Sequence, residues 1–480
     1  IQRQFLADYY HRLPEDDFSP ESTEELIAAA LAHREFGSVR SPDETLVGIN
    51  NVESHLTDPE PCTVVNIVTP DMPFLVDSLT ILLNTRNFSI YRTIHPLFQV
   101  RRSRSHRITA ITRSPTEEEE LKMNAESFIQ FHIDYLPEEE HDTLREDILT
   151  TVNEVATVVS DWSPIREQLL SLAVQLEGRR HVDPEYSRLL RWLENHHFAM
   201  LGYCEFNLSG SPEKPVVRVD RESALGFLRV LGERGSHSIR EFLPPLNPGL
   251  EQPVIITKTR QRSTIHRAAF MDCILVTQPR GKGKRVHCIL GLFSAAAYVR
   301  PTTEIPLLRE KADWILQRST LRKGGYAHKA LRMVFENLPR ESLFQIDRTQ
   351  LFQLSMDILN HQERRKTSVY INQDQCGHFY SCLIYVPREL YHSDLRLKIE
   401  RYLGEVLQGG EVLFDVYFSD SILTRIHFIV HTRSGKSVDH DPQAIEETIQ
   451  NMARDWNDSL RVSLAERYDL KRARELMQDY

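Results

Sequence analysis

Glycine is scarce in this sequence, and its scarcity argues against the sites that depend on it. Only 19 of the 480 residues are glycine, where a typical protein has roughly 7 %. A loop that cradles a phosphate or a dinucleotide uses glycine where the backbone must approach the ligand. Neither G-x-G-x-x-G nor a P-loop occurs, and G-x-S-x-G and H-E-x-x-H are also missing. We therefore predict no catalytic, cofactor-binding or metal-ligating residue and no bound cofactor in this chain.

Long apolar runs are absent as well. No stretch of 18 or more apolar residues could span a membrane, and the first residues, IQRQFLADYYHRLPEDD, contain no apolar core of a signal peptide. The six cysteines include no C-x-x-C pair, which is typical of reduced thiols rather than of a disulfide framework or a zinc finger. We therefore predict a cytoplasmic protein without a membrane partner.

Excess positive charge is missing too. Lysine and arginine number 58 against 68 acidic residues, so the formal net charge is −10. Nucleic-acid binding is driven largely by cationic side chains that neutralise phosphates, and this balance argues against it. The most basic run, RRSRSHR at 101–107, is expected to lie on a solvated hairpin.

The first third of the chain changes its hydrophobic period near residue 61. Residues 1–60 are mostly helical and polar in pattern, with Ser22 or Thr23 as the N-cap of a helix over 21–37. Residues 62–68 form a β-branched run typical of a buried strand, and helical spacing follows over 74–83. The order from there to about residue 159 is β-α-β-β-β-α, close to the split βαβ plan of ferredoxin-like sandwiches.

The rest of the chain alternates between helical and strand-rich stretches. Residues 162–198 are helical, residues 200–294 are largely strands of an antiparallel sheet, and residues 303–365 are helical again. A last α/β unit begins at Ser368 with a hairpin around QDQCG and has the order β-β-α-β-β-α. Because this order differs from that of the first unit, we do not expect a simple tandem repeat.

Two local patterns suggest chemistry but have simpler explanations. Lys323-Gly324-Gly325 resembles a triplet in amino-acid dehydrogenase active sites, but its place between two helical stretches favours a C-cap. Glu194, His196 and His197 lie together in ENHHF and would serve an unrecognised metal-dependent hydrolase. Adjacent histidines on a helix point about 100° apart, so a helix end whose histidines bond the last carbonyl groups is the favoured interpretation.

The segment Thr69-Pro70-Asp71-Met72-Pro73-Phe74 joins the buried strand to the following helix. Such a turn presents backbone N–H groups at a helix N-terminus, where an anion such as an amino-acid carboxylate is favoured. The competing interpretation is a plain capping turn with Asp71 as the cap, and both can hold together.

Several longer segments together carry a family resemblance. They extend from about residue 62 to residue 460 and, in chain order, read TVVNIVTPDMPFLVDSLTILLNTRNFSIYRTIHPLFQVRR, ESFIQFHIDYLP, RWLENHHFAMLGYCEF, ALGFLR, STIHRAAFMDCILV, LGLFSAAAYVRPTTEIPLLREK, LPRESLFQI and FYSCLIYVPRELYHSDLRLKIE. They resemble the N-terminal half of the large NAD-specific bacterial glutamate dehydrogenases.

The resemblance implies a multi-domain α+β fold in which ferredoxin-like ACT-type sandwiches flank a PAS-like antiparallel sheet, with helical linkers between them. The implied order is an N-terminal helical segment, a first ACT-like domain, a helical linker, the PAS-like domain, a second linker, a second ACT-like domain and a charged helical tail. These parts are expected to cover residues 1–60, 61–160, 161–184, 185–300, 301–364, 365–460 and 461–480.

The resemblance also implies a function for the whole family member. That enzyme converts L-glutamate, NAD and water into 2-oxoglutarate, ammonia and NADH, an oxidoreductase reaction of amino-acid catabolism. We expect this chain to be a non-catalytic regulatory and assembly fragment, since it starts at Ile1 and stops before the catalytic domain that would hold NAD. Its expected partners are copies of itself, through the ACT-like domains, and its own C-terminal catalytic domain.

An amino-acid effector is the remaining expected ligand. Asp71, Met72, Phe74 and Asp77 are the predicted contact residues, although the glycine that is usual in ACT ligand loops is missing from this one. The alternative is a stand-alone ACT/PAS sensor or scaffold with no enzymatic domain.

Overall fold

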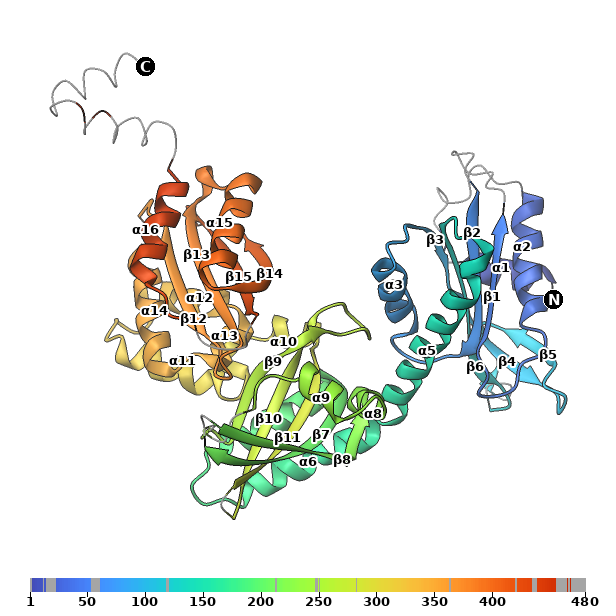
Figure 1. Ribbon diagram of the computed structural model, residues 1–480, viewed down its shortest axis with the longest axis horizontal. Helices are drawn as coiled ribbons and strands as arrows, with labels where there is room; N and C mark the ends of the chain where they lie inside the picture. The colour runs from blue at the N-terminus through green and yellow to red at the C-terminus, as the bar shows by residue number, and fades with distance from the viewer. Residues whose placement is uncertain are drawn as a thin grey trace. The chain divides into compact units, whose positions relative to one another are not determined.

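The protein is described by a computed structural model in which three β-sheets are surrounded by helices (Figure 1). The chain divides into two units, and each is considered by itself. The first unit comprises Ile1–Ser163, Leu225–Val230 and Arg262–Phe270, and the second comprises the remainder. The structure describes residues 2–11, 13, 23–52, 61–117, 121–211, 214–246, 249, 251–281, 283–361, 364–418, 421–433, 438–454, 464 and 467.

The first unit is a six-stranded sheet with helices on both faces. Its strands lie in the order β1-β2-β6-β4-β5, and β3 also pairs with β6. Helices α1 and α2 cover one face, where their aromatic and aliphatic side chains pack on β6, and α3 and α5 lie on the other face. The bounds are α1 Gln2–Tyr10, α2 Thr23–Phe36, β1 Leu46–Val52, β2 Cys62–Pro70, α3 Leu75–Thr85, β3 Ile90–Ile94, β4 Leu97–Arg102, β5 Ile108–Thr112, β6 Asn124–Asp134 and α5 His141–Ser160.

Strand β1 corrects the prediction of a helical segment over 1–60. It pairs antiparallel with β2 in a continuous register from Leu46 opposite Val68 to Val52 opposite Cys62. Its sequence, LVGINNV, contains a glycine and two asparagines, which are residues depleted in strands, so the local pattern hid it. The strand is stabilised by pairing with the buried β2, a contact that its own residue pattern does not reveal.

The two α/β units differ in element order, since four strands separate α3 from α5 whereas two separate α15 from α16, but their sheets are alike. With β1 included, the path β1-β2-β6-β4 of the first sheet matches the order β12-β13-β15-β14 of the last sheet. Strands β3 and β4 pair with successive parts of β6 and together take the place of β14. The two sheets therefore share one topology, to which the first adds β5.

The second unit contains the other two sheets. One has five strands in the order β8-β7-β11-β10-β9, and the other is the four-stranded sheet just described. Helices α11 to α14 lie between them along the chain. The bounds are α6 Trp162–Glu177, α7 Pro184–Trp192, β7 Phe198–Ser211, β8 Lys214–Gly226, α8 Phe227–Glu233, α9 Ser236–Phe242, β9 Val254–Arg262, β10 Phe270–Arg280, β11 Gly283–Phe293, α10 Ala295–Val299, α11 Leu308–Arg318, α12 Tyr326–Asn337, α13 Arg340–Gln345, α14 Arg348–His361, β12 Ser368–Gln373, β13 Phe379–Pro387, α15 Ser393–Val406, β14 Gly409–Tyr417, β15 Leu423–Thr432 and α16 Pro442–Met452.

Alternation along β13 explains why both faces of the last sheet are covered. Cys382 and Ile384 point into a core shared with α15 and α16. Leu383, which lies between them, packs into the core formed by helices α11 to α14. Successive side chains of a strand point to opposite faces, so one strand contributes to two cores. The hairpin predicted around QDQCG is confirmed, and Gly377 has the positive φ of 76° that its turn requires.

No helix in the described part of the chain is long and apolar enough to cross a membrane. The predicted tail at 461–480 lies outside the described residues, except for Leu464 and Arg467.

Candidate functional site

The predicted effector turn lies where β2 ends and α3 begins. Phe74 is the N-cap residue of α3 and has the left-handed φ of 74°, and no side chain caps the helix. A non-glycine residue in this conformation is uncommon and marks a constrained turn. The first N–H groups of a helix have no intrahelical partner and form its positive end, so this turn suits an anionic group.

Asp71 does not cap the helix, which corrects that interpretation of the turn. Its backbone N–H donates to the carbonyl oxygen of Ala125 at 2.9 Å. Its Oδ1 accepts a hydrogen bond of 2.6 Å from the Ser127 hydroxyl, and the Nε2 of His95 lies 3.1 Å from the same hydroxyl. Asp71 is therefore fastened to the neighbouring strand β6.

The loop Arg262–Phe270, which joins β9 to β10, contacts the start of α3. The ring of His266 lies 4.7 Å from that of Phe74, centroid to centroid. Its Nδ1 is 3.4 Å from Oδ2 of Asp77, and its backbone N–H donates to the hydroxyl of the buried Ser78 at 3.2 Å. His266 thus contacts two of the four predicted residues, and also Ser78, which directly follows Asp77.

Of the predicted residues, Phe74 and Asp77 share the contact with His266, whereas Asp71 is bonded to Ser127 of β6. Asp71 and Asp77 are exposed carboxylates on either side of the turn, and Met72 between them is half-buried. Sequence reasoning missed Ser127 and His266. His266 lies 188 residues from Ser78, and no local spacing indicates a contact over that distance. In chemical terms the turn offers N–H groups to a carboxylate and two carboxylates to an ammonium group.

The ENHHF segment is a helix end, as the sequence favoured. α7 ends in the turn Leu193–His197, in which Asn195 and His196 leave the helical conformation, and Nδ1 of His197 lies 2.8 Å from the carbonyl oxygen of Trp192. Glu194 pairs with Arg166 at 2.5 Å. Among the described residues, no group of three or more histidine, cysteine or acidic side chains could hold a metal ion.

The Lys323-Gly324-Gly325 triplet lies between α11 and α12. Gly325 is the N-cap residue of α12, and Gly324 has a φ of 77°. The predicted C-cap is therefore wrong, because α11 ends at Arg318 and the glycines belong to the start of the next helix.

Comparison with known proteins gives a consistent assignment. Three family models match in chain order: the ACT1 domain of glutamate dehydrogenase over residues 5–148, its helical motif 1 over residues 305–364 and its ACT2 domain over residues 368–457. The chain resembles the N-terminal region of the large NAD-specific glutamate dehydrogenases. The resemblance predicted from the sequence is thereby confirmed. The ACT1 match begins at residue 5 and so includes most of α1 and all of α2 and β1, which were predicted as part of a separate segment.

Three curated relatives carry the same name, NAD-specific glutamate dehydrogenase. The protein of Halomonas elongata is 29 % identical over 98 % of this chain, that of Pseudomonas aeruginosa 31 % over 87 %, and that of Mycobacterium tuberculosis 25 % over 90 %. The matched regions make up 30 %, 26 % and 26 % of those proteins. The chain thus spans less than a third of the relatives' own length.

Proposed function

We propose that this chain is the non-catalytic regulatory and assembly region of an NAD-specific glutamate dehydrogenase. The whole enzyme would oxidise L-glutamate to 2-oxoglutarate and ammonia and reduce NAD. The observation that carries the proposal is the occurrence of ACT1, helical motif 1 and ACT2 in order on one chain. NAD would bind outside these regions.

The domain division is part of the proposal. The five-stranded sheet within residues 185–300 has its strands in the spatial order 2-1-5-4-3, which is the PAS arrangement and supports a PAS-like domain there. Self-association through the ACT-like domains is supported by the exposed aromatic side chains of Phe414 and Tyr417 on the edge strand β14. Coupling between these domains and the catalytic domain is the regulation that we propose.

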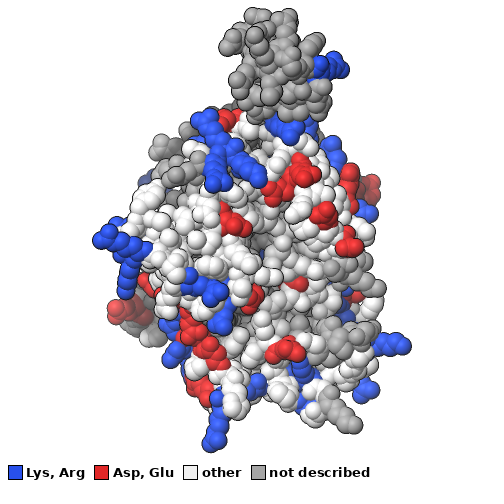
Figure 2. Space-filling view, turned by 90° about the vertical axis from the view of Figure 1, so that its left-hand side faces the viewer, with Lys and Arg blue, Asp and Glu red and all other residues white. Residues whose placement is uncertain are grey.

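The cytoplasmic location and the absence of a nucleic-acid partner are also part of the proposal, and they are supported by the thiols and by the charge distribution. All six cysteines are free, which supports a reducing, cytoplasmic location. On the face shown in Figure 2, basic and acidic side chains are interspersed rather than gathered in a field of one sign. This distribution supports the absence of a nucleic-acid partner.

The effector contact that we propose lies at the start of α3. A zwitterionic amino acid would place its carboxylate on the free N–H groups and its ammonium between Asp71 and Asp77. Met72 and Phe74 would contact its side chain. His266 of the loop Arg262–Phe270 already contacts Phe74 and Asp77. An effector bound to these two residues would therefore compete with the loop.

A thermal-shift titration with the twenty amino acids tests this contact. At a concentration of 100 times its dissociation constant, a ligand stabilises the folded state by about 2.7 kcal/mol. For a unit of this size we expect the Tm to rise by roughly 5–10 °C. Asp71→Ala should abolish the rise, whereas Asp43→Ala, which alters an exposed aspartate of the same unit, should leave it intact. No shift with any amino acid, or an equal shift in Asp71→Ala, would refute the contact.

A further inference from the structure

A groove at one end of the five-stranded sheet has basic side chains in its wall. Its volume is about 360 Å³, and it is lined by residues of β7, β8, β10 and β11, which are successive strands of that sheet (Figure 1). Arg218 of β8, Arg280 of β10 and Lys284 of β11 are among the lining residues. No acidic residue of the described part of the chain lines the groove. Its wall is therefore electropositive.

The two arginines of this wall have no acidic partner among the described residues. Arg218 forms no ion pair with them, and Arg280 donates from Nη1 to a neutral acceptor, Oδ1 of Asn207, at 2.5 Å. Arg285 on the same sheet differs, because its Nη1 lies 3.1 Å from a carboxylate oxygen of Glu205. A guanidinium carries five N–H donors, so Arg218 and Arg280 keep most of theirs available to a ligand.

Gly283 leaves the floor of the groove without a side chain. It lies opposite Arg280 in the β10–β11 register, and β11 separates β10 from β7. A Cβ atom at Gly283 would lie 2.3 Å from the backbone carbonyl oxygen of Leu208 and 3.6 Å from Cβ of Ser209. Only glycine fits so close to another backbone. The bare backbone lets the side chain of Arg280 extend across β11 to Asn207.

Asn207 and Ser209 add neutral donors to the charged ones. Both line the groove, and as residues two apart on β7 they point to the same face of the sheet. Because Oδ1 of Asn207 accepts a hydrogen bond from Arg280, its Nδ2 remains as a donor. The groove therefore offers guanidinium, amide and hydroxyl donors without a competing carboxylate.

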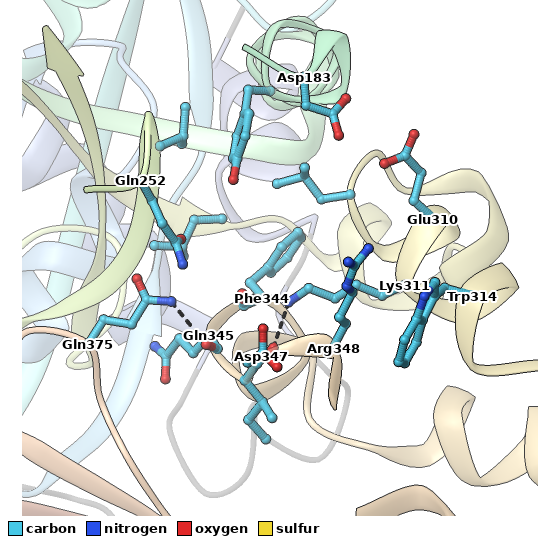
Figure 3. A pocket seen from close by; sticks show the side chains of 15 residues that line it. Asp183, Gln252, Glu310, Lys311, Trp314, Phe344, Gln345, Asp347, Arg348 and Gln375 are labelled. Atoms are coloured by element: carbon cyan, nitrogen blue, oxygen red, sulfur yellow. Dashed lines mark hydrogen bonds between the residues drawn. The ribbon is translucent and has the colours of Figure 1, made fainter. Parts of the chain in front are cut away.

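The cavity shown in Figure 3, of about 230 Å³, is a useful contrast. Nζ of Lys311 donates there to three backbone carbonyl oxygens of the segment 343–346, at 2.7, 2.9 and 2.8 Å, so its ammonium group serves the fold. Asp183, Glu310 and Asp347 also line that cavity, so its wall is not electropositive. The groove of the five-stranded sheet differs from it in both respects.

We propose that this groove binds a phosphate group, either as the free ion or as the ester group of a small metabolite. The phosphate lies over Gly283 between Arg218 and Arg280. It also accepts hydrogen bonds from Asn207 and Ser209. A carboxylate presents two oxygens, which one guanidinium satisfies, whereas a tetrahedral phosphate has oxygens for two guanidinium groups and for neutral donors as well. The groove belongs to the second unit, and the inference does not depend on the effector contact at the start of α3.

Isothermal titration calorimetry of the 480-residue chain in a phosphate-free buffer tests the site. Inorganic phosphate should bind, and Arg218→Gln and Arg280→Gln should each weaken it about tenfold, because each removes a charge-assisted hydrogen bond. Arg260→Gln, which alters an exposed arginine of β9 in the same sheet, should leave the affinity unchanged. Malonate, whose charge is spread over two carboxylates, should bind about tenfold more weakly than phosphate.

Glycerol 3-phosphate distinguishes the two sources of the phosphate group. Tighter binding of this ester than of inorganic phosphate, lost in Arg218→Gln and Arg280→Gln, would support the proposal and identify a phosphorylated metabolite as the ligand. Equal or weaker binding of the ester, with the same dependence on the two arginines, would support the proposal with the free ion as the ligand.

Asn207→Asp provides a readout that a merely structural residue would not give. Its new carboxylate pairs with Arg280, so we expect the Tm of the unliganded chain to be kept or raised while phosphate binding is lost. Absence of phosphate binding, equal binding by malonate, or unchanged binding in Arg218→Gln, Arg280→Gln and Asn207→Asp would overturn the proposal.

Discussion

Lys258→Met is expected to destabilise the second unit by about 3–5 kcal/mol, since it leaves buried charges without a counterion. Lys258 lies on β9 and is 8 % exposed. Its Nζ is 2.9 Å from Oδ1 of Asp272 and 3.7 Å from Oε1 of Glu341. Burial lowers the pKa of Lys258, but the two carboxylates outweigh it, so that the pKa is raised and the lysine stays charged.

Melting curves and urea titrations of the variant measure this effect. We expect a fall in Tm of roughly 5–8 °C, since the unfolding entropy of about 2.1 cal/mol/K per residue is summed over the larger of the two units. Lys329→Met, in which an exposed lysine of α12 is replaced, should stay within about 0.5 kcal/mol of the parent. Lys258→Met combined with Asp272→Asn should recover part of the loss, because the two residues are coupled. An unchanged Tm in Lys258→Met would show that the ion pairs of Lys258 with Asp272 and Glu341 contribute nothing to the stability of the unit.

The second large effect is expected for Glu126→Gln in the first unit, again about 3–5 kcal/mol. Glu126 on β6 is 1 % exposed, and its two carboxylate oxygens lie 2.9 Å from Nη2 of Arg40 and 2.7 Å from Nη2 of Arg102. Arg40 also donates from Nη1 to the backbone carbonyl oxygens of residues 41, 42 and 44, just before β1. Removal of the carboxylate charge leaves the guanidinium groups of Arg40 and Arg102 without this counterion beside β6.

The stability that Glu126 contributes should decrease at low pH. Burial raises the pKa of Glu126, but the hydrogen bonds and charges of Arg102 and Arg40 outweigh it, so that the pKa is lowered. A lowered folded-state pKa stabilises the fold above the unfolded value of about 4.3 and ceases to do so as the pH falls through the folded value. The difference between wild type and Glu126→Gln should therefore be full at pH 7 and shrink progressively below about pH 4.

Urea titrations at a series of pH values measure that difference. Glu139→Gln, which alters an exposed glutamate of the same unit, serves as the matched control and should behave as wild type throughout. A difference of the same size at pH 3 and pH 7, or none at neutral pH, would contradict the account.

Arg102 also shows where local sequence patterns stop being informative. The run RRSRSHR was expected on a solvated hairpin, and Arg101 and Arg104 are indeed exposed. Arg102 instead binds Glu126 and the backbone carbonyl oxygens of Gly37 and His106. Charge and spacing cannot reveal this burial, because the partner lies 24 residues away on another strand.

The elements that could be predicted are those with strong periodicity or turn chemistry. The buried β2, the hairpin at Gly377 and the helix end at His197 all follow from period or residue type. Strand β1 could not be predicted, because its pairing with β2 rather than its own composition stabilises it. The α3 turn was located correctly, but its cap was not, since Asp71 bonds to β6 instead of to the helix.

The central claim is that this chain regulates and assembles but does not catalyse. The most direct test is a glutamate-dependent NAD-reduction assay on the purified chain, with the full-length NAD-specific glutamate dehydrogenase of Pseudomonas aeruginosa as the positive control. We predict that NADH appears with the control enzyme and that none appears with this chain at any concentration. NADH formation by the chain alone, dependent on both glutamate and NAD, would contradict the account.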